Sequence, residues 1–101
     1  MTLEMTLREQ ILMQLVNVID PETGVDVLRM RLVEELTVDE RSGHVTYRFR
    51  PSSPLCPLAH SLVVDIKHAV ASVNGVTGQS ITVVGYVKAQ ELTDLINHDD
   101  V

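Results

Sequence analysis

The chain has 101 residues, of which 45% are hydrophobic, and its 8 basic against 14 acidic residues give a formal charge of −6. This length corresponds to one domain over residues 1–101, and the acidic balance argues against nucleic acid or an anionic membrane as the main partner. We expect no membrane span, since no apolar run approaches roughly 20 residues. We expect no secretion signal, since the N-terminus lacks a basic region followed by an apolar stretch. One cysteine cannot form an intrachain disulfide, which indicates the reducing cytoplasm.

The first predicted element is a helix over residues 6–19. Thr6 and Glu9 form a capping-box pattern at its start. Apolar residues then recur at helical spacing along one stripe: Leu7, Ile11, Leu12, Leu15, Val16 and Ile19. We expect Pro21 to end the helix just past Asp20, and residues 21–31 to form a loop.

Two strands are predicted next, over residues 32–39 and 45–50. Both segments alternate between apolar and polar positions, which is typical of strands with one buried face. The polar link 40–43 turns the chain, so the strands should form a hairpin. The register that buries one face and pairs charges on the other gives these pairs: Val38 with Val45, Leu36 with Tyr47, and Glu35 with Arg48.

The second half of the chain predicts a loop, a helix, a strand and a last helix. Residues 51–55 contain two prolines and two serines and should be a loop. A second helix is expected over 57–73, ended by Asn74-Gly75, and a strand over 81–84. The last helix should span 88–97, before a frayed tail of His98, Asp99 and Asp100. Its inward residues should be Ala89, Leu92, Leu95 and Ile96.

The predicted order is therefore helix, strand, strand, helix, strand, helix. The two hairpin strands must be antiparallel, and a right-handed helical crossover returns the third strand parallel to the second. We expect an α+β domain with a small mixed three-stranded sheet and helices packed mainly on one of its faces.

Cys56 is the only cysteine, and it stands at the predicted start of the second helix. Pro57 suits the first helical position, because its missing N–H would be unpaired there anyway. Free N–H groups and the macrodipole at a helix start favour a thiolate over a thiol. The sulfur is therefore a candidate for reactivity or metal binding. The competing interpretation, more frequent for a lone cysteine, is a small buried apolar residue.

Three more residues could share a site with this sulfur. His60 follows Cys56 by one helical turn, and a thiolate with an imidazole suits zinc or iron. Two ligands do not complete a metal site, so a solvated helix residue is the simpler interpretation of His60. Asp20 and Glu22 flank Pro21 in the predicted loop. They either form a polar turn that ends the helix or present two carboxylates toward the thiol.

Signatures of common enzyme classes are absent. The sequence contains no phosphate-binding loop, no nucleophile elbow and no H-E-x-x-H motif. The G-x-x-G at 75–78 has no basic flank, so we interpret it as a helix cap and turn rather than a nucleic-acid clamp. A Cys–His hydrolase is conceivable, but no orienting group is visible, and an enzyme ranks last among the functions considered.

Taken together, several segments resemble the PaaD/SufT-like iron–sulfur cluster assembly family, once catalogued as domain of unknown function fifty-nine. The segments are DPETG at 20–24, LVEELTV at 32–38, SSPLCPLAHSL at 52–62 and NGV at 74–76. The resemblance covers about residues 7–87 and leaves 88–101 as a C-terminal helix and tail. The matching positions are Asp20, Pro21 and Glu22 for the acidic motif, Cys56 and Pro57 for the cysteine-proline, and Ser52 where threonine is common. Arg31 stands where the family usually has glycine, and the C-terminal tryptophan of many members is missing.

The resemblance implies a cytoplasmic factor that assembles or delivers iron–sulfur clusters. Such a factor would be an adaptor or carrier that works with cluster scaffolds, carriers and client apoproteins, with Cys56 as its contact to iron. Clusters usually need four thiolates, so a chain with one cysteine would hold a cluster or iron only transiently, shared with a partner or with a second copy in a homodimer. The rival functions are an interaction module with an inert buried cysteine and, ranked lower, a thiol-dependent enzyme.

Overall fold

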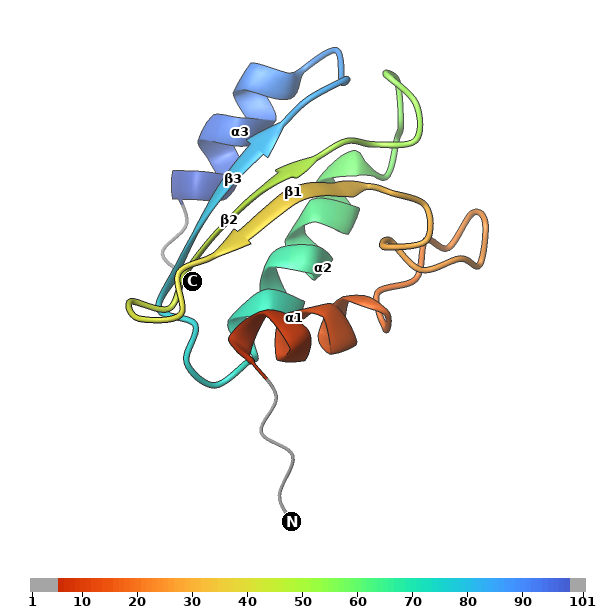
Figure 1. Ribbon diagram of the computed structural model, residues 1–101. Coiled ribbons are helices and arrows are strands. Elements are labelled where there is room, and N and C mark those ends of the chain that lie inside the picture. Colours follow the sequence, from red (N-terminus) through yellow and green to blue (C-terminus); the bar gives the residue numbers. More distant parts are fainter. Residues whose placement is uncertain (1–5, 99–101) are drawn as a thin grey trace.

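A computed structural model describes residues 6–98 and contains six elements in the predicted order (Figure 1). They are α1 (Leu7–Leu15), β1 (Val33–Val38), β2 (His44–Phe49), α2 (Ala59–Ala71), β3 (Gly78–Val83) and α3 (Ala89–His98). The predicted α+β class is confirmed. Of the predicted tail, His98 is the last residue of α3, whereas Asp99 and Asp100 lie outside the described residues.

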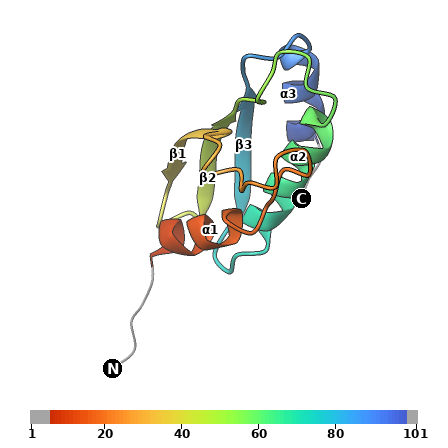
Figure 2. The ribbon, with the colours of Figure 1, turned by 90° about the vertical axis from the view of Figure 1, so that its right-hand side faces the viewer.

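The three strands form one mixed sheet in the order β1-β2-β3 (Figure 2). β1 and β2 are antiparallel and β2 and β3 are parallel, as predicted. Along β2, Val45, Tyr47 and Phe49 are buried while the residues between them are exposed. One face of the sheet is therefore buried beneath the helices, and the other is open to solvent. The buried face is filled mainly by aliphatic side chains of α1 and α2, such as Ile11, Leu15 and Ile66.

The hairpin register is as predicted near the turn and wrong farther along. The ladder pairs Val38 with Val45, Thr37 with Thr46, Glu34 with Arg48 and Val33 with Phe49. β1 thus carries one extra residue, a bulge at Glu35 and Leu36, with Glu35 at a φ of 51°. Neither Leu36 nor Glu35 has its predicted cross-strand partner. The carboxylate of Glu35 nevertheless lies 3.3 Å from the guanidinium of Arg48, an exposed ion pair that contributes little to stability.

α1 ends four residues earlier than predicted. The capping box of Thr6 and Glu9 is present, but the helix stops at Leu15, and Ile19 instead forms an antiparallel bridge with Asp26. The segment that follows Leu15 is rich in β-branched residues, which are weaker helix formers. Val16 and Ile19, predicted on the buried stripe, are exposed.

Boundaries of the later elements also differ from prediction. α2 begins at Ala59 with Leu58 as its N-cap, so Pro57 lies in the preceding turn and is not the first helical residue. β3 begins three residues earlier than predicted, at Gly78. In α3, Leu92 and Ile96 are buried as expected, but Leu95 is 57% exposed and the prediction that it faces inward is wrong.

α3 covers the outer edge of β3. The side-chain amide of Asn97 donates to the carbonyl oxygen of Ile81 at 2.6 Å, and its oxygen accepts from the Ile81 N–H at 2.9 Å. The Thr93 hydroxyl accepts from the Val83 N–H at 2.8 Å. These side chains satisfy groups that another strand would otherwise pair with, which protects an edge strand from unwanted pairing.

A chain of hydrogen bonds links the sheet to α2 and α3 through the core. The Tyr47 hydroxyl donates to the Gln79 side chain at 2.8 Å, and the Gln79 amide donates to the Lys67 carbonyl oxygen at 2.9 Å. The buried Lys67 ammonium donates to the carbonyl oxygen of Ile96 in the last turn of α3, at 2.6 Å. Burial raises the pKa of the Tyr47 hydroxyl well above its usual range.

The hairpin turn is held against the start of β3 at Gly43. Its N–H donates to Asp39 at 2.8 Å, and its carbonyl oxygen accepts from the Thr77 N–H at 2.9 Å. The φ of Gly43 is +82°, and a Cβ there would lie 1.9 Å from the carbonyl oxygen of Gly75. Only glycine fits this close approach of two backbones.

Gly43→Ala should therefore destabilise the fold more than Gly24→Ala. Gly24 also has a positive φ, +71°, but a Cβ there has nothing within 4 Å. Both substitutions carry the left-handed cost of roughly 1–2 kcal/mol, and Gly43→Ala adds a backbone clash of about 1–3 kcal/mol. Urea unfolding of both variants measures the difference, and equal losses would show that the turn can move apart.

Arg31 has a left-handed backbone, with φ at 60°. This is the position where the resembling family usually has glycine, and the conformation supplies the physical reason for that preference. We predict that Arg31→Gly is more stable than Arg31→Ala by about 1 kcal/mol, because both remove the exposed side chain but only glycine relieves the strain. Urea midpoints of the two variants test this, and an alanine variant at least as stable as the glycine variant would contradict it.

Candidate functional site

Three loops meet at one end of the sheet, on the side away from the hairpin turn (Figure 1). They are the segment 16–32 before β1, the segment 50–58 after β2, and the segment 84–88 after β3. The Arg50 N–H donates to the Leu32 carbonyl oxygen at 2.8 Å, and the Val84 N–H donates to the carbonyl oxygen of Phe49, the last residue of β2, at 2.9 Å. The loop of Asp20 and Glu22 and the loop of Cys56 thus lie at the same end of the sheet.

Cys56 is buried, with 5% of its surface exposed, and belongs to the hydrophobic core. Its N–H donates to the Ser53 carbonyl oxygen at 3.1 Å, and its own carbonyl oxygen accepts from the Ala59 N–H at 3.4 Å. The first N–H of α2 therefore points at a backbone oxygen of Cys56, two residues before the N-cap Leu58. The reactivity of the sulfur stays a prediction.

Asp20 is also buried, at 2% exposure, and its carboxylate organises its own loop. Its Oδ1 accepts from the Glu22 N–H at 2.8 Å, across Pro21, which is the pattern of an Asx turn. The Asp20 backbone closes the same loop, with the Gly24 N–H donating to its carbonyl oxygen at 2.8 Å. This arrangement explains the Asp-Pro-Glu sequence through local structure. The Glu22 side chain is exposed and remains available to a partner.

Ser52 and Pro57 lie on the surface of the loop that carries Cys56. The hydroxyl that shapes this loop belongs to Ser53, whose Oγ accepts from the Leu55 N–H at 3.2 Å. Sequence reasoning selected Ser52 by resemblance and missed Ser53. The signal that could have identified Ser53 is its spacing. It stands two residues before Leu55, whose backbone N–H can donate to a serine hydroxyl.

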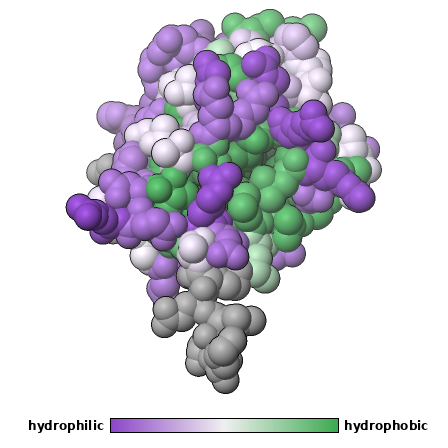
Figure 3. Space-filling view, viewed as in Figure 1, coloured by the Kyte–Doolittle hydropathy of each residue, from purple (hydrophilic) through white to green (hydrophobic). Residues whose placement is uncertain are grey.

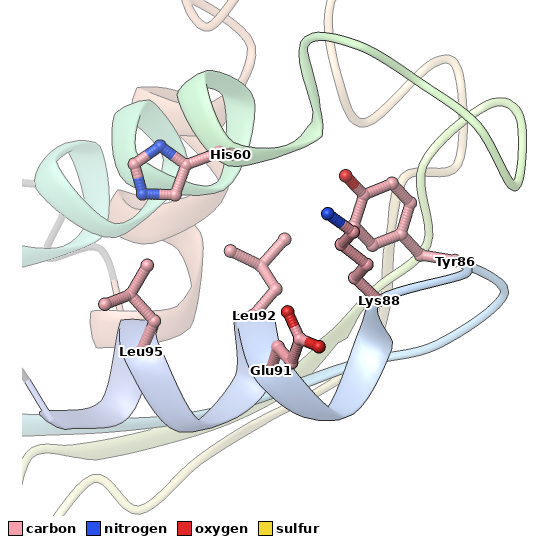
Figure 4. A pocket seen from close by; sticks show the side chains of 6 residues that line it. All are labelled: His60, Tyr86, Lys88, Glu91, Leu92 and Leu95. Atoms are coloured by element: carbon pink, nitrogen blue, oxygen red, sulfur yellow. The ribbon is translucent and has the colours of Figure 1, made fainter.

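His60, in the first turn of α2, lies beside a groove between α2 and α3 (Figure 4). The groove has a volume of about 190 Å³ and is lined by His60, Tyr86, Lys88, Glu91, Leu92 and Leu95. Within residues 6–98 no hydrogen bond joins His60 to Cys56, and no group of three or more His, Cys, Asp or Glu side chains is placed to hold a metal ion. The pairing of Cys56 with His60 at a metal stays a prediction.

Exposed apolar side chains occur around this end of the molecule. Leu55 is 73% exposed and Val87 is 62% exposed, and the loops that carry them touch through the Val87 N–H and the Pro54 carbonyl oxygen at 3.0 Å. Other exposed apolar residues lie in or just after α1: Met13, Val16 and Ile19. Figure 3 shows hydrophobic surface gathered in the middle of one face, bordered by hydrophilic residues. Helical spacing had placed Val16 and Ile19 on the buried stripe, whereas the other three positions were not assigned to the core.

The helices in the described part of the chain, residues 6–98, are all too short or too polar to cross a membrane.

Comparison with known proteins gives a consistent result. The model of the iron–sulfur cluster assembly protein family matches residues 8–83. The Fe–S protein maturation auxiliary factor YitW of Bacillus subtilis is 35% identical over 83 residues, which cover 81% of this chain and 79% of that protein. An uncharacterized protein of Methanocaldococcus jannaschii is 28% identical over 96 residues, covering 95% of this chain and all of its own.

A solved structure agrees with these sequence matches. A domain of unknown function from Bacillus anthracis, of the DUF59 type, superposes with a TM-score of 0.69 at 32% identity, covering 77% of this chain and 74% of that one. The matched family region contains Asp20, Glu22, Cys56 and His60, and it runs from α1 to the end of β3. The chain therefore belongs to the iron–sulfur cluster assembly protein family.

Proposed function

We propose that this chain is an adaptor or carrier that helps assemble iron–sulfur clusters or deliver them to client apoproteins. Family membership supports a role in cluster assembly, and relatives such as YitW are named maturation auxiliary factors. The observation that carries the finer proposal is the position of Cys56, the one cysteine, in a loop at the same end of the sheet as the Asp-Pro-Glu loop. Its partners would be a cluster scaffold or carrier and the client.

The chemistry follows from the number of thiols. A cysteine binds iron as a thiolate, so the thiol must release its proton when the metal arrives. Clusters usually take four thiolates, and this chain has one cysteine. The remaining ligands would come from a scaffold, a client or a second copy of the chain. A cluster or iron is then a transient cargo shared between two proteins.

A second candidate is an interaction module in which Cys56 is inert. The burial of Cys56, at 5% exposure, favours it directly, since a core cysteine behaves as a small apolar residue. A thiol-dependent enzyme ranks lower, because residues 6–98 show no base hydrogen-bonded to the sulfur, as nucleophilic catalysis requires. A cytoplasmic location fits both leading candidates, since one unpaired thiol stays reduced there.

Cys56→Ala should abolish cluster transfer while leaving the protein folded. Removing the buried thiol costs about 1 kcal/mol of stability, too little to unfold a typical domain. The measurement is activation of a client apoprotein by the cluster-loaded scaffold, with iron and sulfide content of the anaerobically purified chain determined alongside.

Val73→Ala is the matched control for that experiment. Val73 is buried just beyond the other end of α2, and its truncation costs about 1–3 kcal/mol without touching the sulfur. Transfer should persist in Val73→Ala and vanish in Cys56→Ala. Equal transfer by both variants would assign the chain to the interaction-module class.

The two loop carboxylates should respond differently to amide substitution. Asp20→Asn keeps an oxygen that can accept from the Glu22 N–H, so the turn should survive with a stability loss below about 1 kcal/mol, whereas Asp20→Ala should cost about 1–3 kcal/mol. Glu22→Gln should leave stability unchanged, and it reduces cluster transfer if the exposed carboxylate contacts iron or a partner. Urea unfolding and the transfer assay separate the two roles. An Asp20→Asn variant that is fully folded but inactive would show that Asp20 acts beyond the turn.

A further inference from the structure

Cys56 is the anchor of its own loop. Between Ser52 and Pro57, the Cys56 side chain alone is buried, and the other five residues are exposed. We call residues 52–57 the cysteine loop. Because the sulfur is the part of this loop that enters the core, any movement that presents the sulfur to a partner also removes the loop's main attachment to the domain.

Few hydrogen bonds hold the cysteine loop in place. The bonds from Cys56 to Ser53 and from Leu55 to Ser53 lie within the loop. In the described part of the chain, the one hydrogen bond that joins the loop to an element other than α2 runs from the Val87 N–H to the Pro54 carbonyl oxygen, at 3.0 Å. Val87 belongs to the β3–α3 connection, so this bond fastens one surface loop to another.

The start of α2 is suited to act as the hinge. Its N-cap, Leu58, makes no side-chain capping hydrogen bond, unlike Thr6 at the start of α1. The Ala59 N–H to Cys56 distance of 3.4 Å is long for a backbone bond. The helix itself is fixed from its first residue, since Ala59 is fully buried and Leu58 packs partly against the core. Pro57 is exposed and precedes the helix, so the chain can turn there without unpacking α2.

We propose that the cysteine loop opens locally, with the Pro54–Val87 hydrogen bond as its latch, and that opening converts Cys56 from a core residue into an exposed ligand. The ligand role rests on the proposed function, whereas the opening itself does not. The structure favours a local event because it exposes one small side chain and breaks one inter-loop bond, while global unfolding exposes the whole core. A buried cysteine and a functional cysteine are then two states of one residue.

Alkylation of the native protein by iodoacetamide tests the opening, without cluster or client. With the reagent slow relative to closing, the labelling rate reports the equilibrium population of the open loop. Local opening exposes little surface, so the rate should rise only weakly with urea below the unfolding transition. Val73→Ala, which weakens the domain at the other end of α2, should leave the rate unchanged. A rate that follows urea as steeply as global unfolding does, and increases in Val73→Ala, would overturn the proposal.

The latch is tested by a matched pair at Val87. Val87→Pro removes the N–H that donates to Pro54, while Val87→Ala keeps it, and both replace the same exposed valine. The Ala89 N–H donates to the Tyr86 carbonyl oxygen at 3.1 Å, so Val87 occupies the second position of a turn, where proline is favoured. We expect labelling of Val87→Pro about fivefold faster than that of Val87→Ala, corresponding to roughly 1 kcal/mol for one net hydrogen bond. Equal rates in the two variants would overturn the latch.

The labelling assay tests the opening of the loop, and the transfer assay tests the proposed function. Either claim can therefore be wrong without the other. If the labelling rate depends only weakly on urea and Cys56→Ala still transfers clusters, the opening is established and the proposed function is wrong. If Cys56 is labelled only through global unfolding and Cys56→Ala loses cluster transfer, the proposed function stands and the opening is overturned.

Discussion

The central strand β2 hydrogen-bonds along both edges, antiparallel to β1 and parallel to β3, and the rest of the molecule depends on this arrangement. Because of these directions, the start of β1 and the ends of β2 and β3 lie at the same end of the sheet. The loops attached to those three ends come together because of the strand directions alone. The Asp-Pro-Glu loop, the cysteine loop and the β3–α3 connection are thereby neighbours, although more than 60 residues separate Asp20 from Val87 in the sequence.

Periodicity predicted the elements and their order, but not the places where local geometry departs from regularity. The predicted register kept one alternation along the whole of β1, whereas the bulge at Glu35 and Leu36 shifts it by one residue, so the register beyond the bulge was wrong. Val16 and Ile19 continue the helical spacing of α1, yet the chain leaves the helix at Leu15 because later backbone groups pair with Val25 and Val27. Leu95 shares the spacing of Leu92 and Ile96, and only the position of α2 shows that it borders a groove.

The candidate site remains a prediction from the sequence, and the structure adds where each of its residues lies. The sequence and its family resemblance selected Asp20, Glu22 and Cys56, and the structure brings their loops to one end of the sheet. The buried carboxylate of Asp20 accepts a backbone hydrogen bond inside its own turn, so a residue of a family motif here has a clear structural task. The environment of Cys56 depends on where α2 begins, and a shift of two residues changes a capping position into a core position. Sequence patterns do not locate the start of a helix to within two residues.

Both edges of the sheet are unsuited to strand addition, and this restricts how two copies of the chain can associate. At β3, Asn97 and Thr93 occupy the groups that another strand would need. At β1, the bulge interrupts the ladder, the Arg8 guanidinium bonds the Leu36 carbonyl oxygen, and a junction centred on Glu34 and Glu35 would bring like charges together. A homodimer built by extending the sheet is therefore disfavoured. Association of two copies would instead use helix or loop surfaces, which leaves the sheet a closed three-stranded unit.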